Sequence, residues 1–252
     1  MNDCKPVGTP METCCKLQQE VNQPDVDHTM YRSMIGSLLY LTATRPDIMH
    51  SVCLVSRFQS TPKISHLNAV KRIMKYISGT LDFGLWYPRH NDFTLTTYID
   101  ADWAGCPDDR KSTSGGALFL GGRLVAWHSK KQNSVSLSTI EAEYIAATTS
   151  CTQVLWMIQT LQVVYLDVLK PVSIFCDNSS AIDISKNPVQ HSRTKHIDIQ
   201  YHFLRERVFA NDVTLHGYTG DEDEAIGNVD EGDYTDAPGG ESEKGDVRRS
   251  TR

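Results

Sequence analysis

The sequence Phe93-Thr-Leu-Thr-Thr-Tyr-Ile-Asp100 decides the fold class. Phe93, Leu95 and Ile99 lie on one side of an alternating pattern, and this period of two predicts a strand with one face against a core. The strand ends on the carboxylate of Asp100, a residue type that is unusual at the end of a buried strand.

The residues after Asp100 complete an α/β pattern. Ala117–Leu120 and Leu124–Trp127, joined by Gly121-Gly122, predict a β-hairpin. The pattern then predicts a long helix, a strand, a helix and a last strand, over residues 138–166, 172–176, 197–208 and 213–216. Elements in this order predict an α/β domain over residues 91–219.

The preceding segment, residues 30–90, has a helical period instead. It predicts three short helices, which begin near Tyr31, Pro46 and Pro62. The third helix carries Lys71, Arg72 and Lys75 largely opposite its apolar face, and this basic flank is either a solvated surface or a contact for phosphate groups. Residues 1–29 contain three prolines, and we expect them to be irregular.

The formal net charge of −6 is unevenly spread over the 252 residues. Residues 211–252 contain 12 acidic and four basic residues and carry −8, which leaves +2 on residues 1–210. The total therefore does not argue against a nucleic-acid partner, because the excess acid lies in the tail. Residues 220–252 are acidic and rich in Gly with few apolar side chains, so we expect them to be disordered.

The composition excludes several classes of protein. With 40% hydrophobic residues the chain is neither collagenous nor wholly disordered. Seven cysteines without a CxxC pair predict neither a disulfide framework nor a zinc ribbon. The N-terminus has no apolar run typical of a signal peptide, and the longest apolar stretch, residues 35–41, is far below the roughly 20 residues of a membrane span. We expect an intracellular protein, cytoplasmic or nuclear, that is neither secreted nor in a membrane.

Three acidic residues occupy positions suited to a shared site. Asp100 ends the first strand, and Asp177 ends the strand after the long helix. Strands joined through a helix can lie parallel and adjacent, which would bring both carboxylates to one edge of the sheet, where ligands commonly bind. We take Ile140 as the centre of the buried stripe of the helix. At 100° per residue around the helix axis, Glu143 lies about 60° from that centre and Glu141 about 100°. We therefore expect Glu143 to join the site and Glu141 to point to water.

Carboxylates gathered at one sheet edge repel each other unless cations neutralise them. Mg²⁺ and Mn²⁺ prefer such oxygen ligands. Two ions about 3.5–4 Å apart can stabilise the attacking and leaving oxygens of a phosphodiester during in-line displacement. The alternative is that Asp100 and Asp177 are turn-forming residues and Glu143 is an ordinary surface residue.

The run Asp100-Ala-Asp-Trp-Ala-Gly-Cys-Pro-Asp-Asp-Arg-Lys-Ser-Thr-Ser-Gly115 resembles the ribonuclease H domain of copia-type LTR retrotransposon Pol polyproteins. The same domain is similar at Ser129-Lys-Lys-Gln132, Leu137-Ser-Thr-Ile-Glu-Ala-Glu-Tyr144, Cys176-Asp-Asn178 and Arg193-Thr-Lys-His-Ile-Asp198. Upstream motifs that match the same polyprotein include Tyr31-Arg-Ser33, Gly36-Ser-Leu38 and Thr44-Arg-Pro-Asp-Ile48. The resemblance runs in order from residue 9 to about residue 208.

The resemblance implies a ribonuclease-H-like fold: a mixed five-stranded sheet with flanking helices, preceded by a small helical segment and followed by the disordered acidic tail. It implies two-metal hydrolysis of the RNA strand of RNA–DNA hybrids, with Mg²⁺ or Mn²⁺ as the cofactor. Asp100, Glu143 and Asp177 match the metal-binding catalytic acids, and Asp198 is a further candidate for the site. Candidates for contacts with nucleic acid are Lys71, Arg72, Lys75, Lys130, Lys131 and His196. Asp102, Asp108 and Asp109 match turn residues.

The sequence departs from the family in two places. It lacks the Tyr-x-Asp-Asp motif of a polymerase palm, so residues 30–90 would be a thumb or connection segment of a reverse transcriptase, and we do not expect the chain to polymerise DNA. A palm domain or the rest of a Pol polyprotein would be a partner. The family's fourth carboxylate is expected near Ile226, where only Asp221 and Asp223 could substitute. The alternative function is therefore a catalytically inactive remnant that binds hybrid or protein.

Overall fold

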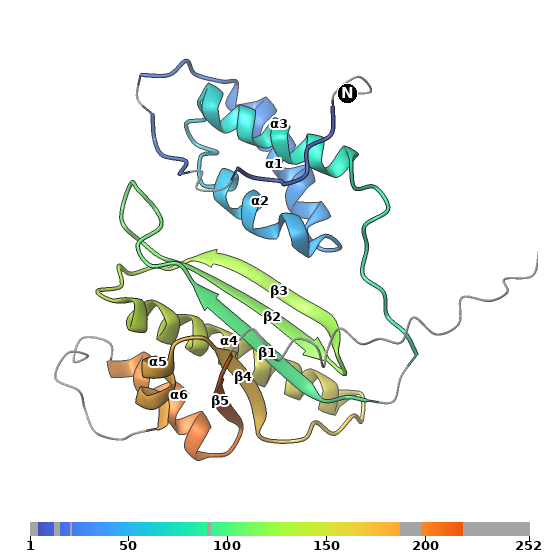
Figure 1. Cartoon of the computed structure of the whole chain (residues 1–252), viewed down its shortest axis with the longest axis vertical. Helices are drawn as coiled ribbons and strands as arrows, with labels where there is room; N and C mark the ends of the chain where they lie inside the picture. Colours follow the sequence, from blue (N-terminus) through green and yellow to red (C-terminus); the bar gives the residue numbers. More distant parts are fainter. Residues whose placement is uncertain (1–4, 13–15, 21, 90–91, 187–197, 219–252) are drawn as a thin grey trace, which may run out of the picture. The chain divides into compact units, whose positions relative to one another are not determined.

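The computed structural model describes residues 5–12, 16–20, 22–89, 92–186 and 198–218 (Figure 1). The acidic tail, for which the sequence predicts disorder, lies outside the described residues. No helix in the described ranges is both long and apolar enough to cross a membrane.

A mixed five-stranded sheet forms the centre of residues 92–218 (Figure 1). Its strands lie in the order β3-β2-β1-β4-β5. β1 pairs antiparallel with β2, and β2 with β3, whereas β1 pairs parallel with β4, and β4 with β5. The strand bounds are β1 Leu95–Ala101, β2 Thr113–Leu120, β3 Arg123–Lys131, β4 Val172–Cys176 and β5 Val213–Gly217.

Helices pack on the sheet and close its core (Figure 1). They are α4 Thr139–Val163, α5 Ser179–Lys186 and α6 Asp198–Phe209. Alternate residues of β1, among them Leu95 and Ile99, are buried and share one hydrophobic cluster with Tyr144, Cys151 and Ile158 of α4. The alternation read from the sequence thus turns one face of β1 toward α4, as period-two patterning requires.

The predicted elements of this domain are confirmed, with two differences. The hairpin strands extend beyond the predicted limits, and Gly121 and Gly122 at its turn have φ angles of 55° and 74°, in the region that favours glycine. Helix α5 is absent from the sequence-based prediction. It has only eight residues, too few for a clear helical period, although Asn178 caps it by accepting a hydrogen bond from the Ala181 backbone N–H at 3.0 Å.

Residues 28–78 form the small helical segment that the sequence predicts. Its helices are α1 His28–Leu41, the 3₁₀ helix η1 Pro46–Ile48, α2 Met49–Ser56 and α3 Ile64–Ser78. The segment has its own hydrophobic cluster, which includes the fully buried Tyr31, Val52 and Ile73. The predicted start at a proline holds for η1, where Pro46 occupies the first turn.

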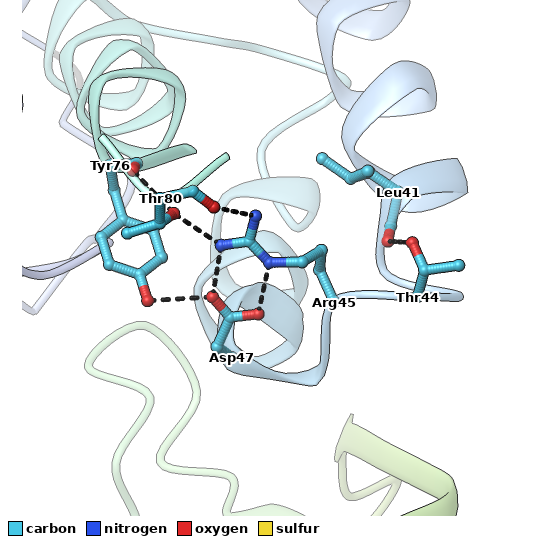
Figure 2. Close-up of polar contacts among 6 residues, drawn as sticks. All are labelled: Leu41, Thr44, Arg45, Asp47, Tyr76 and Thr80. Carbon is cyan, nitrogen blue, oxygen red and sulfur yellow. Dashed lines mark hydrogen bonds and ion pairs between the residues drawn. The ribbon is translucent and has the colours of Figure 1, made fainter. Parts of the chain in front are cut away.

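A buried arginine, Arg45, forms hydrogen bonds both to Thr80, just after α3, and to Asp47 of η1 (Figure 2). The Arg45 guanidinium donates to both carboxylate oxygens of Asp47, at 2.9 and 2.7 Å, and to the Thr80 carbonyl oxygen at 2.9 Å. The Tyr76 hydroxyl donates to the same carboxylate at 2.9 Å. These bonds hold the pKa of Asp47 below its usual range, chiefly through Arg45. The arrangement holds Thr80, just after the end of α3, against η1.

Side chains also join the helical segment to β2 and β3. The Trp127 indole N–H donates to the Thr42 carbonyl oxygen at 2.9 Å, and Arg57 donates to the Thr113 hydroxyl at 2.9 Å. These contacts place the helical segment beside β2 and β3. The proposed boundary between the helical segment and the α/β domain, at residues 90 and 91, lies outside the described residues.

Candidate metal centre at the ends of two parallel strands

Asp100 and Asp177 lie at the carboxyl ends of neighbouring parallel strands. In the register of β1 and β4, Tyr98 is opposite Phe175, and each aspartate follows two residues later on its own chain path. Both side chains are exposed. Partial burial raises the pKa of Asp100, and the negative charge of Asp177 raises it further. The two carboxylates therefore lie close enough to repel each other, as their positions in the sequence predicted.

Glu143 brings a third carboxylate to these strand ends from the first turns of α4. Its side chain is only 5% exposed, and its Oε1 accepts a hydrogen bond from the Ala101 backbone N–H at 2.9 Å. Burial raises the pKa of Glu143 to about 7, and the charges of Asp177 and Asp100 act in the same direction against the Ala101 bond. The fold therefore holds an acid at the sheet edge in a position where its ionised form is disfavoured.

The chemistry of these residues fits a divalent cation. Ligand atoms of Glu143, Cys176 and Asp177 all lie within 4.8 Å of one another, and Asp100 adds a carboxylate whose charge helps to raise the pKa of Glu143. Repulsion among carboxylates raises pKa values, and a hard cation with oxygen ligands removes that repulsion. The residues present are thus suited to Mg²⁺ or Mn²⁺.

The expectation that Glu141 points to water is wrong. Its side chain is 5% exposed, and Oε2 accepts a hydrogen bond from the Leu137 backbone N–H at 2.8 Å. The Ser138 hydroxyl in turn accepts from the Glu141 N–H at 3.2 Å. Glu141 is therefore part of the N-terminal cap of α4, where backbone N–H groups lack helical partners and attract a carboxylate. The angle around the helix was misleading here because it takes no account of the helix terminus.

Of the aspartates after β1, Asp108 and Asp109 lie in a turn, as expected, whereas Asp102 lies outside it. Asp102 accepts a hydrogen bond from the Thr113 backbone N–H, which links the end of β1 to the start of β2. A side chain at Gly105 would collide with the Asp102 carboxylate, so the motif needs glycine there. Residues 107–109 form a turn, in which Asp109 accepts from the Lys111 N–H at 3.3 Å.

The candidates for nucleic-acid contact have different surroundings. Lys71 and Lys130 are exposed, and Lys75 is partly exposed. Two of the cations are engaged by acids. Arg72 pairs with Glu12 at 3.0 Å, and Lys131 pairs with Asp109 at 2.8 Å. His196 lies outside the described residues, as do Asp221, Asp223 and Ile226, whereas Asp198 begins α6 and its side chain is not among those described.

Two residues near the carboxylates escaped prediction from the sequence. Cys176 directs its thiol toward Glu143, and His50 of α2 places Nδ1 3.2 Å from the Ser129 hydroxyl oxygen. Burial lowers the pKa of His50, and the charge of Arg57 lowers it further, against the opposing effects of Asp102 and Asp100. The Cys-Asp pair at the end of β4 could have signalled the thiol. No local signal could have found His50, because 79 residues separate it from Ser129.

The sequence resembles known proteins over most of its length. It is 41% identical over 208 residues to the "Retrovirus-related Pol polyprotein from transposon RE2" of Arabidopsis thaliana. It is 43% identical over 215 residues to that from transposon TNT 1-94 of Nicotiana tabacum. These matches take in 82% of this chain but only 14% and 16% of the relatives, so the chain spans a small part of their length. A third relative, the "Secreted RxLR effector protein 161" of Plasmopara viticola, is 41% identical over 128 residues, which make up 90% of it. No protein-family model matches the chain.

Solved structures also resemble the fold. A ribonuclease H1, LC11-RNase H1, isolated from compost by a metagenomic approach, matches 53% of this chain and 90% of its own, with 14% identity and a TM-score of 0.38. The protease-reverse transcriptase of a foamy virus with double-stranded DNA matches 80% of this chain and 40% of its own, with 12% identity and a TM-score of 0.46.

The fold agrees with the sequence relatives. The mixed sheet β3-β2-β1-β4-β5 with its packed helices is the ribonuclease-H-like fold that the resemblance implied. The sequence identity to two plant transposon polyproteins extends upstream of that fold into the helical segment, because it takes in 82% of the chain. Over 82% of its length the chain is therefore homologous to a part of the retrovirus-related Pol polyproteins of copia-type retrotransposons.

Proposed function

We propose that this chain, which carries a retrotransposon ribonuclease-H-like domain, hydrolyses the RNA strand of RNA–DNA hybrids. The observation that supports this most is the convergence of the buried Glu143 and the exposed Asp100 and Asp177 at the ends of β1 and β4, where burial and the two like charges raise the pKa of Glu143. Burying an acid beside two like charges lowers the stability of the folded state, and such an arrangement is typical of a functional site. The retrotransposon relatives and the fold supply the reaction class.

Asp100, Glu143 and Asp177 would hold two Mg²⁺ or Mn²⁺ ions. The ions would supply charge neutralisation and activation of the attacking water. Asp100 and Asp177 are exposed and can accept an ion directly from solvent. The Ala101 N–H donates a hydrogen bond to Oε1 of Glu143 and so fixes the orientation of the carboxylate. Asp198 remains a proposed further acid of the site.

The hybrid would lie along the exposed edge of this site. Lys130 is exposed on β3 and is proposed to bind a backbone phosphate, together with Lys131 and with His196. Lys71, Arg72 and Lys75 of α3 are proposed to extend the contact along the helical segment. A duplex that keeps an RNA strand offers 2′-hydroxyls in a wide minor groove, by which hybrid can be told from DNA. A polymerase palm or the rest of a Pol polyprotein is proposed as the protein partner, in an intracellular setting.

A cleavage assay with a labelled RNA–DNA hybrid tests the function. The wild-type chain should cut the RNA strand with Mg²⁺ or Mn²⁺ and leave double-stranded DNA intact. Asp177→Asn should lower the cleavage rate by at least about 100-fold. The substitution removes a proposed metal ligand itself, and not a residue that only orients a ligand. Asp183→Asn, on the exposed side of α5, is the matched control and should retain wild-type activity. No cleavage with either metal would refute the proposal.

The alternative function gives a different result in the same experiment. An inactive remnant would bind the hybrid, measured by fluorescence anisotropy, without cutting it under any metal. In that case Asp177→Asn would bind as well as the wild type, or better, because a negative charge near phosphates has been removed.

A further inference from the structure

A row of residues runs across the sheet from Asp100 toward the helical segment. Asp100 is opposite Gly115 of β2, and Gly115 is opposite Ser129 of β3. Directly opposite residues of antiparallel strands point to the same face, so the Ser129 hydroxyl lies on the face of Asp100, two strand spacings of about 4.8 Å away. No side chain stands between them in this row, and a Cβ atom at Gly115 would have only the Asp100 carbonyl oxygen within reach, at 3.7 Å.

Helix α2 brings two nitrogen-bearing side chains to the far end of this row. Nδ1 of His50 lies 3.2 Å from the Ser129 hydroxyl oxygen. Arg57, which follows the last residue of α2, donates to the Thr113 hydroxyl at 2.9 Å. Thr113 lies two residues before Gly115 and therefore on the same face of the sheet. Seven residues make nearly two helical turns, so His50 and Arg57 lie on one side of α2, the side that meets this face.

Arg57 is a half-buried cation without an acidic partner. None of the ion pairs among the described residues includes it, and its Nε is buried there without a hydrogen-bond partner. An arginine removed from water is usually paired with an acid. Burial lowers the pKa of His50, and the charge of Arg57 lowers it further, so the two side chains lie close enough to interact. An anion beside them would supply the charge that Arg57 lacks.

We propose that Arg57, His50 and the Ser129 hydroxyl bind a backbone phosphate of the hybrid whose scissile bond lies at the carboxylates. Each of these groups can donate a hydrogen bond, and phosphate oxygens accept them, most strongly from a guanidinium. Phosphates recur roughly every 3 Å of helical rise on each strand, so a duplex at Asp100 has further phosphates within reach of Ser129. The contact holds the duplex in register with the metal centre, and it rests on the proposed binding of hybrid.

The salt dependence of hybrid binding tests the contact without reference to cleavage. Fluorescence anisotropy of a labelled RNA–DNA hybrid is measured with the full chain in EDTA, between about 50 and 200 mM salt. Arg57→Gln, whose amide can still donate to the Thr113 hydroxyl, should lower the slope of log K against log salt by about 1. It should also weaken binding about tenfold at about 100 mM salt. Arg57→Lys should keep the wild-type slope, because it keeps the charge.

Arg123→Gln is the matched control for this measurement. Arg123 begins β3, roughly 20 Å along the strand from Ser129, and its guanidinium donates to the carbonyl oxygens of Gly121 and Asp92. Its loss removes the same charge from the protein at a distance from the proposed contact. The salt slope of Arg123→Gln should therefore equal that of the wild type.

The imidazole of His50 provides a second measurement on the wild-type chain itself. Its proton resonances, assigned by their loss in His50→Gln, should shift when the hybrid is added in EDTA. The resonances of His66, which is fully buried in the helical segment and stacked on Phe58, should not shift. This measurement stands even if Arg57→Gln does not fold.

Cleavage kinetics separate a contact that holds the strand from a group that takes part in the reaction. With Mg²⁺, Arg57→Gln should raise KM for the hybrid about tenfold and leave kcat within about twofold of the wild type. An unchanged salt slope in Arg57→Gln would overturn the site, as would an equal fall in Arg57→Lys, an unshifted His50 signal or a wild-type chain that does not bind hybrid. A lowered slope in a chain that binds hybrid without cutting it would refute the nuclease proposal and leave the site standing.

Discussion

Replacing Glu143 with Gln removes one negative charge from the strand ends while keeping an oxygen that can accept the Ala101 N–H. The carboxyl group has its pKa raised from 4.5 to about 7 in the fold. A tenfold change in acidity corresponds to about 1.4 kcal/mol between the protonated and ionised forms. Without a divalent cation, ionised Glu143 therefore lowers the free energy of unfolding by roughly 3 kcal/mol, and the amide should recover that amount.

The sign of this effect depends on pH. Because the folded pKa lies above the unfolded one, the folded state binds the proton more tightly, and the stability linked to Glu143 is complete only below about pH 4.5. That stability is lost progressively as pH rises to about 7 and beyond. The penalty of the wild type is thus under about 1 kcal/mol at pH 5 and about 3 kcal/mol at pH 8.

Urea denaturation in EDTA at pH 5 and pH 8 measures the difference. The gain from Glu143→Gln should be larger at pH 8 by roughly 2.5 kcal/mol. Glu141→Gln is the matched control, because its carboxylate caps α4 through the Leu137 N–H. It should destabilise the protein at both pH values. An equal gain from Glu143→Gln at the two pH values would refute the electrostatic account of the site.

Three further predictions concern metal, the helical segment and nucleic acid. Mg²⁺ at 100 times its dissociation constant should stabilise the wild type by about 2.7 kcal/mol in thermal unfolding and should fail to do so in Asp177→Asn. Arg45→Ala should cost roughly 3–5 kcal/mol in urea denaturation, because Arg45 is 6% exposed and its loss leaves the Asp47 carboxylate without its cation; a cost below about 1 kcal/mol would show that the ion pair is dispensable. Lys130→Ala should weaken hybrid binding and lower the salt slope by about 1, whereas Arg72→Ala, already paired with Glu12, should change it less; equal slopes would contradict this.

The sequence predicted the α/β domain because its signals are local. The alternation from Phe93 to Asp100, the Gly121-Gly122 turn and the apolar stripe from Tyr144 to Ile158 each lie within one element, where period and turn chemistry act directly. Asp100, Asp177 and Glu143 could be selected for the same reason. Two sit at strand ends, and the third sits at a fixed angle on a helix. Helix α5 was missed because eight residues carry too short a period.

The sequence by itself determined which elements form and which acids end them, because hydrophobic period and backbone preference are properties of neighbouring residues. Only the tertiary structure decided what surrounds those acids. The burial that raises the pKa of Glu143, the thiol of Cys176 beside it and the approach of His50 to Ser129 all join residues distant along the chain. Packing brings such groups together, and desolvation and charge act through space. Glu141, two residues from Glu143, became a helix cap for a local reason instead, because the Leu137 N–H at the start of α4 has no helical partner.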